Sequence, residues 1–209
     1  MNKMIITINR ECGSGGGEIA RLLGKKFGFK VYGRNELEAV AERFGITLEE
    51  LDRIKAEKPN WWDEFCSFYQ QFGAAGYKPG GMAEPTSKSV YYAEARFLRD
   101  LAEKESCIIV GRAGFHIFRD DPNALHILII AKHDARIARI ARKQNLSLDE
   151  AAKVVDKVDE ARDNFVQTVT DTSRYDARNY NFVFDVTGMD TEKLASYIAE
   201  IICSKKALV

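Results

Sequence analysis

The sequence lacks the features of membrane, nucleic-acid-binding and disulfide-bonded proteins. Its 31 basic and 31 acidic side chains cancel, so overall charge does not favour a nucleic acid or a membrane as partner. No apolar run approaches the ~20 residues that span a bilayer, and the first apolar stretch is too short for a signal peptide. The four cysteines (Cys12, Cys66, Cys107 and Cys203) are far apart, without metal-binding or redox-motif spacing. We therefore expect a cytoplasmic protein with reduced thiols, in which any anion site is built locally.

Proline is also scarce, and three of the four prolines fall between residues 57 and 89. This stretch is rich in glycine and in aromatic residues, with Trp61 and Trp62 near its start. We interpret it as a short amphipathic helix and a loop, inserted between core elements over about residues 55–90. With 209 residues, of which 45% are hydrophobic, the chain suits one domain over residues 1–209.

Short apolar runs alternate with amphipathic segments along the chain. The apolar runs predict strands at residues 4–9, 29–33, 106–111, 124–131 and 180–186. Helical periodicity predicts helices at residues 18–27, 36–45, 47–57, 90–104, 134–144, 147–170 and 190–206. The near-continuous apolar character of several runs is typical of strands covered on both faces. This alternation predicts an α/β fold with a parallel sheet.

A glycine-rich segment, "ECGSGGGEIARLLG", joins the first expected strand to the first expected helix. Its small residues 13–17 allow positive φ and close approach, so that successive N–H groups converge on an anion at the helix N-terminus. Two other interpretations remain open: a turn without a ligand, and the looser dinucleotide-binding fingerprint at Gly15, Gly17 and Ala20. The fingerprint is weakened because Arg34, and not an acid, closes the second strand.

Charged side chains recur on the helices expected at residues 134–144 and 147–170. Their spacing of three brings several of them within reach of one another, and such arginines could clamp a polyphosphate. The set comprises Arg136, Arg139, Arg142, Asp156, Asp159 and Arg162. A solvated pair of charged helices is the alternative interpretation. Arg112 follows the strand at 106–111, at the sheet edge where open α/β proteins bind ligands.

Together these segments resemble the cytidylate kinase-like family of P-loop nucleoside-monophosphate kinases. The resemblance runs from "ITINRECGSGGGEIARLLG" through "LAEKESCIIVGRAGFHIF" to "YNFVFDVTGMDTEKL". It implies a P-loop NTPase-type three-layer α/β/α fold with about five parallel strands and a helical lid at about residues 134–170. It also implies an enzyme that uses ATP and Mg²⁺ to phosphorylate a cytidylate-like nucleoside monophosphate or a similar small acceptor.

The resemblance also implies a role for each matching position. The residues expected to hold the ATP phosphates are Gly13, Ser14, Gly15, Gly16, Gly17 and Glu18. Catalytic roles on the lid side fall to Arg136, Arg139 and Arg162, and Arg142 belongs to the lid. The residues expected on the acceptor side are Arg34, Arg96, Arg112, Asp156 and Asp159. The expected Mg²⁺ ligand is Ser14, with Glu18 as the alternative.

The chain departs from the family that it resembles at two glycines, and a third stands where other P-loops carry a lysine. Gly16 occupies the position of the Walker lysine, which relatives in this family usually also lack. Gly17 occupies the position of the Mg²⁺-coordinating Ser/Thr, where relatives commonly carry a basic or polar residue. Gly33 follows the tyrosine of the second strand, where relatives tend to carry an acid. Losing a phosphate-binding charge costs a few kcal/mol of transition-state stabilisation unless another cation replaces it. We expect Arg10, which directly follows the first expected strand, to supply that charge.

Two functional hypotheses follow, and a third is more distant. The first is a kinase in which Arg10 and the lid arginines compensate for the missing lysine. The second is a catalytically weak nucleotide- or anion-binding protein of the same fold, which the three consecutive glycines favour. The third, a nicotinamide-dinucleotide enzyme, is disfavoured by the missing acid and by the arginine-rich helix pair. The oligomeric state does not follow from the sequence.

Overall fold

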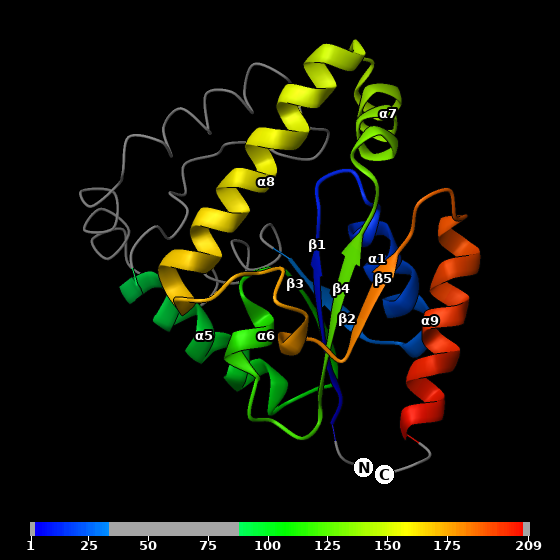
Figure 1. The fold of residues 1–209 in the computed structure, drawn as a ribbon. Coiled ribbons are helices and arrows are strands. Elements are labelled where there is room, and N and C mark those ends of the chain that lie inside the picture. Colours follow the sequence, from blue (N-terminus) through cyan, green and yellow to red (C-terminus); the bar gives the residue numbers. More distant parts are fainter. Residues whose placement is uncertain (1–2, 34–87, 207–209) are drawn as a thin grey trace.

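A parallel sheet forms the centre of the molecule (Figure 1). The computed structural model describes residues 3–33 and 88–206, so Arg34 and nearly all of the expected insertion lie outside the described residues. Within these residues the strands are β1 (Ile5–Arg10), β2 (Lys30–Tyr32), β3 (Cys107–Val110), β4 (Ala124–Ile130) and β5 (Phe182–Asp185). Their order across the sheet is β2-β3-β1-β4-β5, and every pairing is parallel. The predicted α/β fold with five parallel strands is confirmed.

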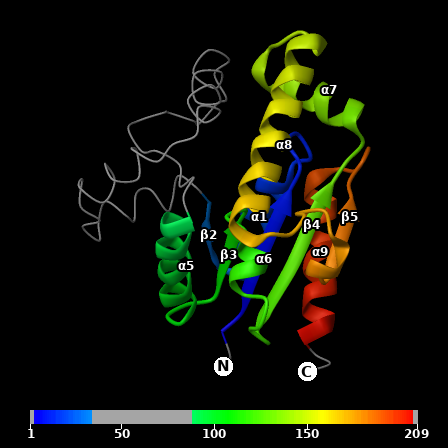
Figure 2. The same cartoon turned by 60° about the vertical axis from the view of Figure 1, so that its left-hand side comes forward.

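Helices cover both faces of this sheet. They are α1 (Gly16–Phe27), α5 (Lys88–Ala102), α6 (Gly114–Ile117), α7 (His133–Gln144), α8 (Leu148–Thr170) and α9 (Thr191–Lys206). Helices α1 and α9 pack on one face, while α5, α6 and the end of α8 pack on the other (Figures 1 and 2). Helix α7 and the start of α8 stand beyond the carboxyl ends of the strands (Figure 2). The sequence pattern did not predict the four-residue α6 or the 3₁₀ turn Ala177–Asn179.

The central strands are apolar on both sides because both sides are buried. Ile6 and Ile8 of β1 face the α1–α9 layer, whereas Ile5 belongs to the cluster under α5 and α6. All three side chains are at most 3% exposed. Continuous burial of this kind explains why the sequence shows apolar runs here instead of alternation.

Helix α8 links two parts of the core. It begins at Ser147, whose hydroxyl accepts from the Glu150 N–H while the Glu150 carboxylate accepts from the Ser147 N–H. Its first half packs with α7 and with Cys12 in a separate apolar cluster. Its last turns pass into the main core, where Val166 and Val169 are buried beside α5 and α6. One helix of 23 residues, about 35 Å long, therefore connects the region above the sheet with the core below.

The packing of α1 against β2 depends on a glycine inside the helix. A Cβ at Gly24 would lie 2.5 Å from Val31 Cγ2 and 2.9 Å from the Phe29 carbonyl oxygen. We expect Gly24→Ala to lower the free energy of unfolding by about 1–2 kcal/mol, because overpacking outweighs the gain in helix propensity. Gly17→Ala is the matched control, since among the described residues nothing lies within 4 Å of its Cβ. Urea denaturation measures both; equal stability of the two variants would contradict this packing.

Candidate functional site

The glycine loop lies at the carboxyl end of β1, between that strand and α1. Gly13 has φ +78° and Gly15 has φ +86°, values that side chains rarely adopt. A Cβ at Gly13 would also lie 2.6 Å from the carbonyl oxygen of Arg136, so α7 passes directly against the loop. The Ser14 hydroxyl donates to the Glu11 carbonyl at 2.9 Å, which closes the turn from within. The glycines are therefore required by both the turn and the close approach of α7.

The loop directs a set of backbone donors toward the start of α1. Among the described residues, no hydrogen bond occupies the N–H groups of Gly13, Gly15, Gly16 or Gly17. Gly16 and Gly17 form the first turn of α1, where the helix dipole is positive. Such a group of N–H donors at a helix N-terminus is a binding site for phosphate. This arrangement supports the interpretation of the loop as an anion site.

Arg10 occupies the space that a side chain at residue 16 would need. A Cβ at Gly16 would lie 2.6 Å from Arg10 Cβ and 3.0 Å from Arg10 Cγ. A Cβ at Gly111, after β3, would lie 2.5 Å from Arg10 Nη1. The Arg10 side chain therefore extends from the first turn of α1 to the end of β3. Residue 16 has no room for a lysine, while the neighbouring Gly17 faces open space among the described residues.

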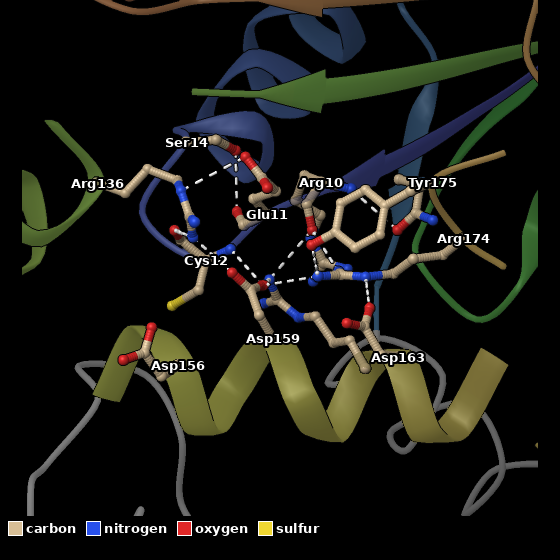
Figure 3. A network of polar contacts seen from close by, with 12 residues as sticks. Arg10, Glu11, Cys12, Ser14, Arg136, Asp156, Asp159, Asp163, Arg174 and Tyr175 are labelled. Carbon is tan, nitrogen blue, oxygen red and sulfur yellow. Dashed lines mark hydrogen bonds and ion pairs between the residues drawn. The ribbon is translucent and has the colours of Figure 1, made fainter. Parts of the chain in front are cut away.

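A buried carboxylate on α8, Asp159, points from that helix toward the loop and holds it (Figure 3). It is 8% exposed, and it accepts a hydrogen bond from the Cys12 backbone N–H at 2.8 Å. It also pairs with Arg136 and Arg174, and it lies 3.7 Å from Arg162. Breaking a buried pair of this kind costs about 3–5 kcal/mol, because the remaining charge is left without compensation. Asp159 therefore fixes the glycine loop to the helix pair.

The arginines expected on the lid side donate to backbone carbonyls of the loop. Arg136 is 8% exposed and donates to the carbonyls of Ala131 and Cys12. Arg139 donates to the Ser14 carbonyl at 3.1 Å, and Arg162 donates to the Arg10 carbonyl at 3.2 Å. Because carbonyl oxygens repel phosphate, their occupation by guanidinium groups leaves a surface of N–H donors and positive charge.

Sequence reasoning missed Arg174, a central member of this network. Its side chain is 1% exposed and donates to the Arg10 carbonyl, to Asp159 and to Asp163. It comes from the segment after α8, which showed neither periodicity nor a motif. Burial raises the pKa of Asp163, and the Arg174 guanidinium opposes that rise. The folded chain thus places a cation that no spacing in the sequence could have indicated.

Among the described residues, the ion pairs of the loop arginines involve neither Asp156 nor the thiol of Cys12. Asp156 lies one turn before Asp159 but outside the arginine network (Figure 3). Its carboxylate pairs with His133 at 2.6 Å. Burial raises the pKa of the Cys12 thiol, and nearby arginines oppose the rise only in part. A thiol of this kind packs as a small apolar group.

The other residues predicted to belong to the site differ in how deeply they are buried. Arg112 is 8% exposed and follows β3 with φ +58°, at the same sheet edge as the glycine loop. Arg96 on α5 and Arg142 on α7 are exposed. Ser14 is 1% exposed and its hydroxyl is turned into the loop, a geometry that does not favour it as a metal ligand. Glu18 is exposed in the first turn of α1.

Arg174 allows a test of the network on stability. We expect Arg174→Met to lower the free energy of unfolding by about 3 kcal/mol, because Asp159 loses a buried partner and the Arg10 carbonyl loses a donor. Arg178→Met is the control, since Arg178 is 90% exposed and pairs with Asp176 at the surface. Chemical denaturation measures both variants. A loss no larger than that of the control would mean that the network contributes little.

Tyr180, which contacts this network, makes the free energy of unfolding depend on pH in the alkaline range. The Tyr180 hydroxyl donates to the Arg174 carbonyl at 2.6 Å and accepts from Asn9, and burial raises its pKa to about 12. Since the fold favours the protonated form, this contribution is complete below pH ~10 and is lost as pH rises toward ~12. We expect the stability difference between wild type and Tyr180→Phe to shrink by about 2 kcal/mol over that range. Thermal unfolding measured against pH tests this, with Tyr197→Phe, at a residue 54% exposed, as the surface control.

Residues 3–33 and 88–206 contain no cluster of three or more His, Cys, Asp or Glu side chains arranged to hold a metal ion. In the same part of the chain, no helix combines the length and apolar character needed to cross a membrane.

The fold is similar to those of known proteins. A crystal structure of an uncharacterized protein from Eubacterium ventriosum superposes with a TM-score of 0.71 at 22% identity, covering 97% of this chain and 99% of that chain. Shikimate kinase from Acinetobacter baumannii, in complex with shikimate, gives a TM-score of 0.51 at 12% identity, with 98% and 95% covered. These similarities concern the fold, and no curated protein matches the sequence. The model of the cytidylate kinase-like family matches residues 5–188, and the protein therefore belongs to that family.

Proposed function

We propose that the protein is a kinase that transfers the γ-phosphoryl group of ATP to a small acceptor bearing a phosphate, with a cytidylate-like monophosphate as the first candidate. The observation that carries this proposal is a group of four N–H donors, surrounded by guanidinium groups, that no hydrogen bond occupies among the described residues: those of Gly13, Gly15, Gly16 and Gly17. Membership of a kinase-like family agrees with it. The fold supplies the strand, loop and helix on which such enzymes bind phosphates.

Positive charge exceeds negative charge around the loop. Among the described residues, five arginines and four carboxylates lie at or around the loop: Arg10, Arg136, Arg139, Arg162 and Arg174, and Glu11, Glu18, Asp159 and Asp163. The chain as a whole is neutral, so this excess is a local feature. An anion bound on the loop would complete the charge balance of the site. Much of the charge that a Walker lysine brings elsewhere is thus supplied by arginines.

Arg10 is the arginine that we assign to the transferred group. Its side chain runs from the first turn of α1 toward Gly111, and therefore from the loop toward the residue that precedes Arg112. An acceptor phosphate at Arg112 and an ATP γ-phosphate at the loop would lie on either side of it. A guanidinium there stabilises charge that develops between donor and acceptor. The helix pair α7 and the first half of α8 takes the place of the lid in this assignment.

The residues of the loop also fit a metal–nucleotide complex. Mg²⁺, when bound, would neutralise part of the charge of the nucleotide phosphates. Glu18 lies exposed beside the loop donors, and we assign it as the side chain that contacts the metal, directly or through water. Ser14, buried and bonded to Glu11, keeps the loop closed in this assignment.

A catalytically weak nucleotide- or anion-binding protein is the second candidate. It is favoured by the engagement of Arg136, Arg162 and Arg174 in holding the loop, which leaves fewer cations for a transition state. An ADP-release assay with ATP, Mg²⁺ and a panel of monophosphates and small metabolites decides between the two, alongside calorimetric ATP binding. Turnover with one acceptor supports the kinase, and binding without turnover supports the second candidate. Absence of ATP binding would contradict both.

The assignment of Arg10 makes a kinetic prediction. We expect Arg10→Met to reduce kcat by about 10²–10³-fold, because the charge acts on the transition state, while ATP affinity falls less than tenfold. Arg119→Met is the control, since Arg119 is exposed and pairs with Asp120. Both variants are assayed at saturating ATP and acceptor, with thermal unfolding as the check on folding. Equal losses of kcat and ATP affinity in the Arg10 variant would show that Arg10 only helps to bind the nucleotide.

A further inference from the structure

Arg112 sits in a backbone conformation that its own side chain does not favour. Three consecutive residues after β3 have positive φ: Gly111 at +77°, Arg112 at +58° and Ala113 at +49°. Left-handed conformations cost energy in residues with a Cβ, and they persist only where surrounding contacts hold them. Some neighbouring group must therefore hold Arg112 in place.

An aromatic ring on α8 meets the guanidinium of Arg112. The Arg112 Cζ atom lies 4.9 Å from the centroid of the Phe165 ring, within the range of a cation–π interaction. Both groups are largely removed from water, since Arg112 is 8% exposed and Phe165 packs against the main core. Stacking engages the face of the guanidinium and not the N–H donors at its edge, so an orienting contact and an anion contact are compatible.

Phe165 is itself held by the core. Its ring meets the ring of Tyr91 edge to face, with centroids 6.3 Å apart and planes at 78°. Tyr91, on α5, is 2% exposed. The ring that contacts Arg112 is therefore partly buried and packs against the apolar cluster of the main core.

Asp159, which holds the glycine loop, lies on the same helix. It precedes Phe165 by six residues, which corresponds to about 9 Å along the axis of α8. The loop and Arg112 therefore both contact one continuous helix, α8. The loop contacts it through the carboxylate of Asp159, and Arg112 contacts it through the ring of Phe165.

We propose that Phe165 is a positioning residue, which sets the orientation of the Arg112 guanidinium and, through α8, its spacing from the glycine loop. The step from an oriented Arg112 to acceptor binding rests on the proposed kinase function. A phosphate group of the acceptor would then meet a guanidinium already held in place, without the loss of side-chain entropy on binding.

Three variants test this role. Phe165→Leu keeps an apolar side chain and removes the ring, Phe165→Tyr keeps the ring, and Val166→Ala is the control. Val166 is 4% exposed in the same core cluster and lies about 100° further round the helix. We expect Phe165→Leu to weaken binding of CMP and of inorganic phosphate about tenfold by calorimetry, with ATP affinity changed less than twofold. Phe165→Tyr should bind as wild type does, and Val166→Ala should lose stability without losing CMP affinity.

Unchanged CMP affinity in Phe165→Leu would overturn the proposal, as would an equal loss in Val166→Ala. If wild type binds neither CMP nor phosphate, the acceptor assignment has failed, and the positioning role is decided by NMR of the Arg112 Nε–Hε group. We expect this group to be ordered in wild type and in Phe165→Tyr, and mobile in Phe165→Leu. An Nε–Hε group that stays ordered in Phe165→Leu would overturn the positioning role, whether or not any acceptor binds.

Discussion

The contact between Asp159 and the glycine loop is the interaction on which the site depends. A loop of small residues has little side-chain packing of its own, and its conformation must be imposed from outside. Asp159 does this through the Cys12 N–H, while arginines that pair with it also bind the loop carbonyls. Asp159 is only 8% exposed, and a charged carboxylate so deeply buried would destabilise the fold if it had no partners. Guanidinium groups and a backbone N–H donor surround it and compensate its charge. The same charges that fold the loop also create its positive potential.

The packing around Gly16 explains why this loop has no lysine at the Walker position. Gly16 cannot carry a side chain because Arg10 fills the adjacent volume, and Arg10 can extend across the loop only because Gly16 and Gly111 are glycines. The position of the Arg10 side chain and the glycines at residues 16 and 111 therefore depend on each other. The positive charge at the loop comes from the strand that precedes it. Arg10 also offers its carbonyl to Arg162 and Arg174, so the residue is fixed at its backbone as well. A guanidinium held in this way loses little freedom when it meets a phosphate.

Much of the fold could be predicted from the sequence, because each central strand is a short apolar run bounded by charge or glycine. The order of strands and helices, and the extents of α7 and α8, follow from periodicity and capping residues. Residues of the site on regular elements, such as Asp159, could also be identified by spacing. Arg174 could not, because it lies in an irregular segment and reaches the loop only through the folded chain. Neither could the direction of Arg136, whose helical position is compatible with either solvent or the loop.

Helix α8 contacts the helix pair, the glycine loop and the main core, and so fixes their positions relative to one another. Its first half packs with α7 above the sheet, its middle carries Asp159 against the glycine loop, and its last turns enter the main core beside α5. A lid that opened freely would have to break a buried ionic network at Asp159 and then bend a continuous helix before Phe165. Helices bend sharply at proline, glycine pairs or interrupted hydrogen bonds, and α8 contains neither proline nor glycine. Motion above the loop is therefore expected at the turn between α7 and α8, around Asn145 with φ +56°, and not within α8.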